Sequence, residues 1–151
     1  MNRHDTDEAG NLPAADGLIQ LSRVVQGVFA DTSEQHDLTP VQAKLLCVLA
    51  LGPLGMAELA RLFGVEKATL TGLIDRAERR GLVQRSAVPG DRRALRVSLT
   101  NVGRRAATRF HADATEQLNG LLAPLGSADV ERFRRAMAKV VGSQLVAREP
   151  A

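Results

Sequence analysis

The sequence predicts a mainly α-helical protein that carries one small β-hairpin. Apolar residues recur at three- and four-residue intervals along most of the 151 residues, which is the period of amphipathic helices. Residues 88–100 are different, because a Pro-Gly pair precedes an alternation of apolar and polar positions that is typical of a turn and a strand. With 44% hydrophobic and 25% charged residues, the chain has the composition of a globular protein with a real core.

The first two helices are predicted from periodicity and from a capping signal. We expect residues 1–15 to be disordered, because they are polar and aperiodic. A helix then begins at Asp16 and ends in the polar patch Asp31–Asp37. The second helix starts at Thr39, where Pro40 and a capping box with Gln42 favour initiation, and it ends before Gly52-Pro53. The apolar stripe of the first helix is Leu18, Leu21, Val24, Val25, Val28 and Phe29.

Two shorter helices and the hairpin follow. The segment GMAELARLFG is expected to form a helix that stops at Gly64, and the next helix spans Glu66–Arg80 with Gly81 as its stop. Pro89-Gly90 fits a type II turn between the strand segments LVQRSAV and ALRVSLT. The residues expected to face inward are Leu59, Leu62 and Phe63 in the first of these helices, and Leu95, Val97 and Leu99 in the second strand.

A long helix and a final helix complete the chain. Thr100 can cap the long helix, which would run for about 25 residues, roughly 37 Å, before Pro124-Leu125-Gly126 breaks it. Ser127 can cap the last helix. The stripe of the long helix is Val102, Ala106, Phe110, Ala114, Leu118, Leu122 and Leu125, and that of the last is Val130, Phe133, Met137, Val140, Val141 and Leu145.

Basic charge is concentrated in the middle of the chain. Residues 1–65 carry a net charge of −4, residues 66–109 a net charge of +7, and residues 110–151 none. A basic block between acidic and neutral segments is the distribution expected for a protein that binds a polyanion.

The helix Glu66–Arg80 has the pattern of a helix that enters a DNA major groove. When Leu70, Leu73, Ile74 and Ala77 face inward, small and basic residues point outward, and small residues allow close approach to the groove. Gly72 costs roughly 1 kcal/mol of helix stability relative to alanine, which close approach of DNA would explain. The alternatives are that Gly72 serves packing and that the arginines form a solvated face.

The hairpin supports DNA binding independently of the helix. Arg92 and Arg93 stand side by side at its tip, where their mutual repulsion is unfavourable unless an anion meets them. A narrow tip can enter a minor groove, where the negative potential favours arginine. Two short helices followed by a basic hairpin describe a winged helix-turn-helix.

These residues also carry a family resemblance. The segment Leu38–Arg105, with its patterns L-I-D-R…R-G-L-V-Q-R and D-R-R…V-S-L-T-x-x-G-R, resembles the core of MarR-family (multiple antibiotic resistance regulator) transcription factors. The resemblance implies a homodimer that binds a palindromic operator in double-stranded DNA and represses transcription. It further implies release by a small phenolic or other anionic ligand. Gly72 departs from the family, in which many members carry a longer polar residue there.

The resemblance assigns roles to individual residues. It implies that Arg93 reaches the minor groove, that Asp91 orients it by a carboxylate–guanidinium bond, and that Asp75 pairs with a neighbouring arginine. The expected major-groove residues are Lys67, Ala68, Thr69, Thr71, Gly72 and Arg76. The expected wing residues are Asp91, Arg92 and Arg93, and the expected phosphate contacts are Arg85 and Arg96.

The terminal helices predict dimerisation from their own pattern. Their apolar stripes are more than a small winged lobe can cover, so they would be exposed patches in a monomer. The alternative is that they pack within one chain. The resulting organisation is a tail (1–15), a dimerisation helix (16–37), a winged helix-turn-helix (38–100) and dimerisation helices (101–148).

Other function classes find less support. No signal peptide, membrane span, phosphate loop, zinc motif or nucleophile elbow is recognised, so we expect a cytoplasmic protein that is not an enzyme and holds no cofactor or metal. Aromatic residues are 3%, which argues against recognition of single strands by stacking. Cys47 as a redox switch, and His36 with Glu34, Asp37 and His111 as a metal site, are weaker alternatives than a core thiol and solvated polarity. A winged-helix module that binds protein also remains open.

Overall fold

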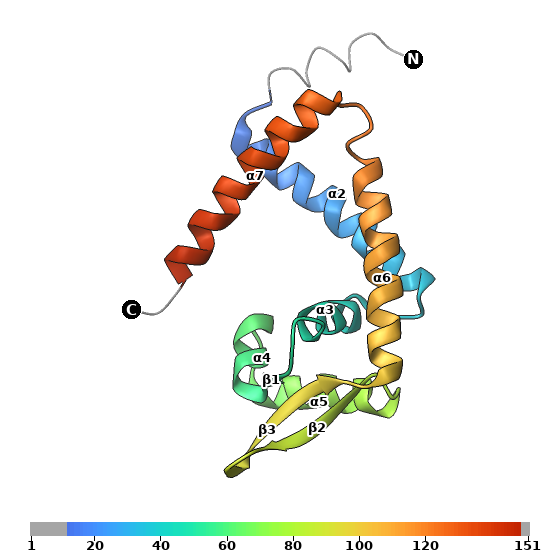
Figure 1. Ribbon diagram of the computed structural model, residues 1–151, viewed down its shortest axis with the longest axis vertical. Coiled ribbons are helices and arrows are strands. Elements are labelled where there is room, and N and C mark those ends of the chain that lie inside the picture. The colour runs from blue at the N-terminus through green and yellow to red at the C-terminus, as the bar shows by residue number, and fades with distance from the viewer. Residues whose placement is uncertain (1–11, 149–151) are drawn as a thin grey trace. The chain divides into compact units, whose positions relative to one another are not determined.

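The computed structural model describes residues 12–148, which form six α-helices and three β-strands (Figure 1). The helix α2 begins at Ala14, two residues before the predicted start, and the predicted disorder of residues 1–11 lies outside the described residues. The chain divides into two units between Thr115 and Glu116. The elements are α2 (Ala14–Gln35), α3 (Pro40–Leu49), β1 (Leu54–Gly55), α4 (Met56–Phe63), α5 (Lys67–Arg79), β2 (Val83–Val88), β3 (Asp91–Leu99), α6 (Asn101–Gly120) and α7 (Ser127–Arg148).

A three-stranded antiparallel sheet with the order β1-β3-β2 belongs to the first unit. The strands β2 and β3 form the predicted hairpin, with Val83 opposite Leu99 and Arg85 opposite Val97. The strand β1 pairs Leu54 with Val97 and was not predicted, because two residues are too short to show an alternating pattern. Through β1, β3 becomes a central strand that is held on both edges.

The core of the first unit lies between the sheet and helices α3, α4, α5 and α6 (Figure 1). Every one of these elements contributes fully or nearly fully buried residues, and burial of each large apolar side chain stabilises the fold by about 1.5–3 kcal/mol. The largest apolar side chains below 2% exposure are Phe110, Leu46, Leu59, Leu70, Ile74, Val83 and Val97.

Two residues expected to face inward are exposed instead. Leu62 is 55% exposed because the short α4 turns Leu59 toward the core, and Leu95 is 42% exposed because the outer half of the hairpin extends past the core (Figure 1). Val102 belongs to the apolar stripe that we expected to be uncovered in a single chain, and it is 49% exposed. The buried side of α6 is Gly103, Ala107, Phe110 and Ala114, of which only the last two belong to that stripe.

The helix α2 ends at Gln35, inside the polar patch Asp31–Asp37 where we expected it to end. Thr32 and Ser33 are fully buried, and their hydroxyls donate hydrogen bonds of 2.8 and 2.6 Å to the carbonyls of Val28 and Phe29. These bonds within the helix satisfy the polar groups, so the polar sequence does not interrupt α2. Its apolar stripe is largely exposed in the single chain, including Leu18 at 63%.

The predicted capping signals of α3 and α6 are confirmed. The Gln42 N–H donates to Thr39 Oγ1 and the Thr39 N–H donates to Gln42 Oε1, both at 3.1 Å, which completes the capping box. The Gly103 N–H donates to Thr100 Oγ1 at 3.0 Å. At Gly103 the backbone of α6 approaches Leu82 so closely that an added Cβ would lie 1.8 Å from the Leu82 carbonyl oxygen.

The second unit contains the end of α6 and the whole of α7. The helix α6 is 20 residues long rather than about 25, because it stops at Gly120 and gives way to turns. Ser127 is the first residue of α7, and Met137, Val140 and Val141 are exposed, whereas the Leu145 side chain lies outside the described ones. Over residues 12–148, no helix is both long and apolar enough to cross a membrane.

Candidate nucleic-acid interface

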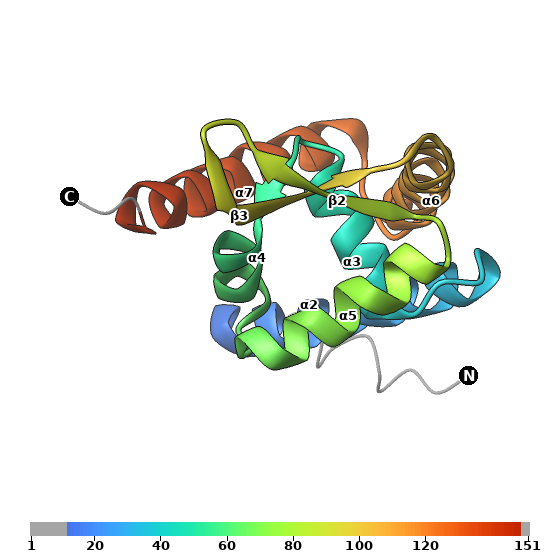
Figure 2. The same ribbon diagram turned by 90° about the horizontal axis from the view of Figure 1, so that it is seen from below.

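The helix α5 presents one buried face and one open face. Leu70, Ile74 and Ala77 are buried as expected, and Leu73 is half-buried. The open face lies on the same side of the first unit as the hairpin (Figure 2). We call this surface the basic face: it comprises the exposed α5 residues Lys67, Ala68, Thr69, Arg76 and Arg79 and the exposed hairpin-tip residues Arg92 and Arg93.

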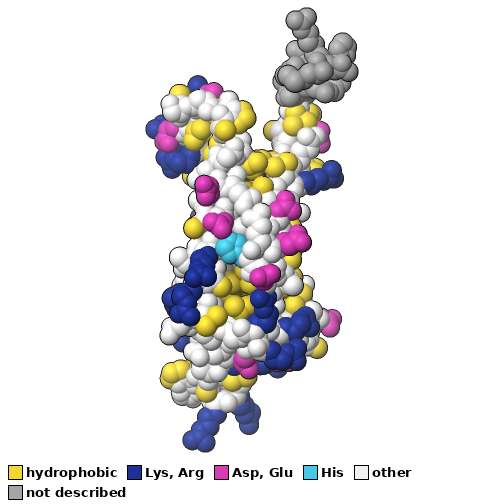
Figure 3. Space-filling model, turned by 90° about the vertical axis from the view of Figure 1, so that its right-hand side faces the viewer, with side chains coloured by type: hydrophobic (Ala, Val, Ile, Leu, Met, Phe, Trp, Pro, Cys, Tyr) yellow, Lys and Arg dark blue, Asp and Glu magenta, His cyan; other side chains and the backbone are white. Residues whose placement is uncertain are grey.

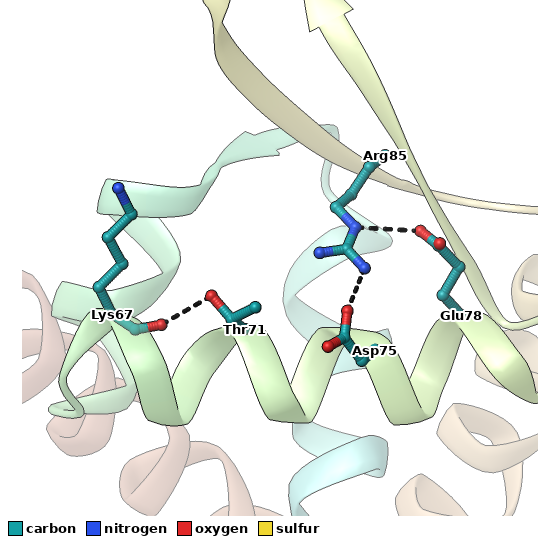
Figure 4. Close-up of polar contacts among 5 residues, drawn as sticks. All are labelled: Lys67, Thr71, Asp75, Glu78 and Arg85. Carbon is teal, nitrogen blue, oxygen red and sulfur yellow. Dashed lines mark hydrogen bonds and ion pairs between the residues drawn. The ribbon is translucent and has the colours of Figure 1, made fainter.

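Small residues in the middle of α5 project little from its open face, so the helix backbone lies close to the surface there. The Thr71 hydroxyl donates to the Lys67 carbonyl at 2.9 Å, so this side chain lies against its own helix (Figure 4). An added Cβ at Gly72 would meet only Arg76 Nη1, at 3.6 Å, which is an ordinary contact. Packing within the free protein therefore does not require glycine at this position, which contradicts the alternative that Gly72 serves packing.

Arg85 on β2 joins the hairpin to α5. Its guanidinium donates to the Asp75 carboxylate and, at 3.2 Å, to Glu78 (Figure 4). These hydrogen bonds, with Asp75 first, raise the pKa of Arg85 above its usual value. The expected pairing of Asp75 with a neighbouring arginine is thus confirmed. Arg85 was expected near phosphates, but the structure directs two of its nitrogens toward the protein, whereas Arg96 is exposed on β3.

The turn at the hairpin tip exposes both arginines. Gly90 has the positive φ of +85° that the predicted turn requires, and the strand pairing is irregular between Ala87 and Val88. Asp91 Oδ1 accepts a hydrogen bond from the backbone N–H of Arg93 at 3.0 Å. Asp91 therefore shapes the backbone at the tip, rather than forming the expected carboxylate–guanidinium bond in this structure.

Two contacts between helices were missed by sequence reasoning. Arg80 Nη1 donates to Gln42 Oε1 at 2.7 Å and so connects the end of α5 to the first turn of α3. Lys44 Nζ lies 4.7 Å from the centre of the Phe63 ring, which connects α3 to α4. The members of each pair are far apart in the sequence, so local patterns carry no signal for either contact.

The comparisons with known proteins identify the family. The MarR family profile matches residues 36–94. The HTH-type transcriptional repressor NicR of Pseudomonas putida is 40% identical to this chain over 77 residues. The alignment covers 50% of this chain and 49% of NicR, so the chain matches about half the length of this relative. The homoprotocatechuate degradative operon repressor of Escherichia coli is 30% identical over 121 residues, which cover 70% of the chain and 82% of that repressor. The chain belongs to the MarR family of transcriptional regulators.

Solved structures agree with this assignment. Wild-type MarR from E. coli, in its apo form, superposes with a TM-score of 0.77 over 85% of this chain and 96% of that one at 24% identity, which shows the MarR fold. NadR in complex with 4-hydroxyphenylacetate superposes with a TM-score of 0.67 over 82% and 89% of the two chains, at 26% identity. The named relatives are MarR-family regulators rather than enzymes.

An apolar hollow of about 620 Å³ lies between α2 and α3 of this MarR-family chain. Its walls include Val25, Phe29 and Val41, and the cationic residue Lys44 also lines it, with its Nζ over the Phe63 ring. An apolar site with one cation suits a small aromatic anion.

Cys47 and His36, the residues considered for redox or metal sensing, have surroundings that favour a structural role. Burial raises the pKa of the Cys47 thiol, which lowers its thiolate fraction at neutral pH and agrees with the core interpretation. His36 Nε2 lies 2.7 Å from Asp113 Oδ2, and its ring packs on Phe110, so His36 joins the end of α2 to α6 rather than remaining solvated. Over the described residues, no three side chains of metal-binding type gather.

Proposed function

We propose that the chain is a sequence-specific regulator that binds double-stranded DNA and represses nearby genes. The observation that carries the proposal is the basic face, where an exposed helix with a small-residue surface and a tip with two free arginines lie on one side of the unit (Figure 2). In this arrangement α5 reads the major groove and Arg93 enters the minor groove. Because its partner is the chromosome, we place the protein in the cytoplasm.

The proposed major-groove residues divide into two kinds. Lys67 and Arg76 are exposed and can donate to base edges or phosphates, whereas Ala68, Thr69, Thr71 and Gly72 set the depth at which α5 lies in the groove. Arg96 is our candidate for a phosphate contact beside the wing. Arg85 is assigned to positioning, because it holds β2 against α5 through two carboxylates.

We further propose that the active form is a homodimer on a palindromic operator. In the single chain, the α2 residues Leu18, Ile19 and Val24 are 48–63% exposed, and the α7 residues Val140 and Val141 are 57% and 56% exposed. Apolar surface of this extent on two helices favours a covering partner. Two lobes about 34 Å apart would then meet successive major grooves.

A small phenolic acid is the proposed effector. The hollow between α2 and α3 offers apolar walls and a lining lysine, Lys44, and the similar protein NadR is known in complex with 4-hydroxyphenylacetate. A ligand there contacts both α2 and α3, so it can bias the position of the DNA-binding elements relative to α2.

Selection of DNA from a random pool tests the proposal. The full chain should enrich duplexes that share one inverted-repeat consensus, and this consensus should bind more tightly than its shuffled version. Enrichment without any consensus would contradict sequence-specific recognition. The competing assignment, a winged module that binds protein, predicts no steep salt dependence with any duplex, whereas several phosphate contacts produce one.

A further inference from the structure

A cluster of arginines on α6 lies outside the basic face. Asn101, Arg104, Arg105, Thr108 and Arg109 line an open hollow of about 390 Å³ on the exposed side of the helix. The buried residues Gly103, Ala107 and Phe110 occupy the opposite side. We call these five residues the α6 arginine face.

The positive charges of Arg104, Arg105 and Arg109 are unfavourably placed in the free protein for three reasons. Arg105 and Arg109 are four residues apart, so like charges lie on adjacent turns. Arg104 and Arg105 stand near the positive end of the helix dipole, and the first turn of α6 holds no acidic residue. Within residues 12–148, none of the three arginines forms an ion pair, whereas Arg85, Arg132, Arg134 and Arg135 all do.

The α6 arginine face begins on the side of the unit that carries the basic face. The helix α6 follows β3 directly, so its first turn lies at the end of the sheet. Figure 2, which shows the molecule from below, views α6 end-on, and α5 faces the viewer in the same picture. Figure 3 shows the side of the molecule where α6 lies. In its lower half, toward the hairpin, Lys and Arg side chains cover more of the surface than Asp and Glu side chains do.

We propose that the α6 arginine face contacts the phosphate backbone of bound DNA as a third region, beside α5 and the hairpin tip. The inference rests on the proposed DNA binding. A phosphate backbone supplies the repeated negative charge that three exposed guanidiniums require, and Arg105 and Arg109, about 6 Å apart along the helix axis, can meet it with flexible side chains. Such contacts add affinity without reading sequence.

These contacts can be measured directly from the salt dependence of DNA binding. The probe is a mixed-sequence duplex of about 30 base pairs, which is about three helical turns. Arg105→Gln and Arg109→Gln should each reduce the slope of log affinity against log salt by about 0.9 per subunit, about 1.8 for the bound dimer, so that the affinity lost between 50 and 200 mM salt shrinks by about 12-fold per variant. Arg105→Lys should keep the wild-type slope, because it retains the charge.

The matched control is Arg23→Gln, which removes one exposed positive charge from α2 and should leave the slope unchanged. All variants should keep the oligomeric state and a thermal midpoint at or above that of the wild type, since removal of a repelled charge does not weaken folding. A wild-type slope in the α6 variants would overturn the inference while wild-type binding still supports the proposed function. Dissociation of the α6 variants into smaller species would also overturn it, since the arginines would then serve a second copy of the chain. Failure of the wild-type protein to bind the duplex would refute both proposals.

Discussion

Two glycines within helices illustrate opposite reasons for the same residue. At Gly103 the free protein excludes a side chain, because an added Cβ would lie 1.8 Å from the Leu82 carbonyl oxygen. At Gly72 the free protein accepts one, with its nearest contact at 3.6 Å. The sequence shows two costly helix positions, and only the structure separates the one that packing requires from the one that lies on the open face of α5.

Gly72→Ala should therefore stabilise the protein and weaken DNA binding. The gain in helix propensity is about 1 kcal/mol, which raises the thermal midpoint by about 3 °C. The added methyl group lies on the face that enters the groove, so affinity for the selected duplex should fall by about tenfold. Calorimetry and fluorescence anisotropy measure the two effects. Gly27→Ala in α2, where an added Cβ meets nothing within 4 Å, should stabilise the protein without the loss of affinity.

Gly103→Ala should destabilise the whole first unit. The collision involves backbone atoms of Leu82, which cannot rotate away as a side chain would, and it also disturbs the Thr100 cap. We expect a loss of about 3 kcal/mol in the free energy of unfolding, measured by urea denaturation. A loss below about 1 kcal/mol would show that α6 shifts easily relative to β2.

At the scale of elements, the sequence predicted what local chemistry determines. The capping box at Thr39, the ends of α3 and α5, and the turn at Gly90 follow from short patterns, and the structure has all of them. The strand β1 and the Arg80–Gln42 and Arg85–Asp75 pairs depend on residues brought together only by the fold.

The polar patch Asp31–Asp37 correctly marked where α2 ends, but it gave no sign that Thr32 and Ser33 are buried. Their hydroxyls bond to carbonyls one turn earlier, which satisfies them inside the fold. For Leu62, helical periodicity predicted the correct element but not the side that packs, because the position of the neighbouring elements decides that.

The connection between β2 and α5 yields a prediction that separates positioning from phosphate contact. Arg85→Met should weaken binding to the selected duplex, because the hairpin loses its attachment to Asp75 and Glu78. The slope of log affinity against log salt should nevertheless stay at the wild-type value. A slope reduced by about 1.8, which is about 0.9 for each subunit of the bound dimer, would instead assign Arg85 to a phosphate. Arg96→Met is the comparison, since we expect that variant to show the reduced slope.

At the scale of the whole molecule, the exposed apolar residues of α2 and α7 support the proposed homodimer. Deletion of residues 132–151 should produce monomers, because it removes most of the α7 surface that a partner would cover. The monomers should bind the selected duplex poorly, since one lobe makes half the contacts. Light scattering checks the first expectation, and a stable dimer of the truncated chain would contradict it.

The family assignment and the basic face together make a single claim, that this MarR-family chain reads a DNA sequence through α5 and the hairpin. The most direct measurement is an equilibrium titration of the full chain with the selected duplex and with a shuffled duplex of equal length, at fixed salt. The wild-type protein should prefer the selected duplex by about 10³-fold or more. Arg93→Ala should lose about tenfold or more of that affinity, whereas Arg23→Ala should not. Equal affinity for the two duplexes would contradict sequence-specific recognition by α5 and the hairpin.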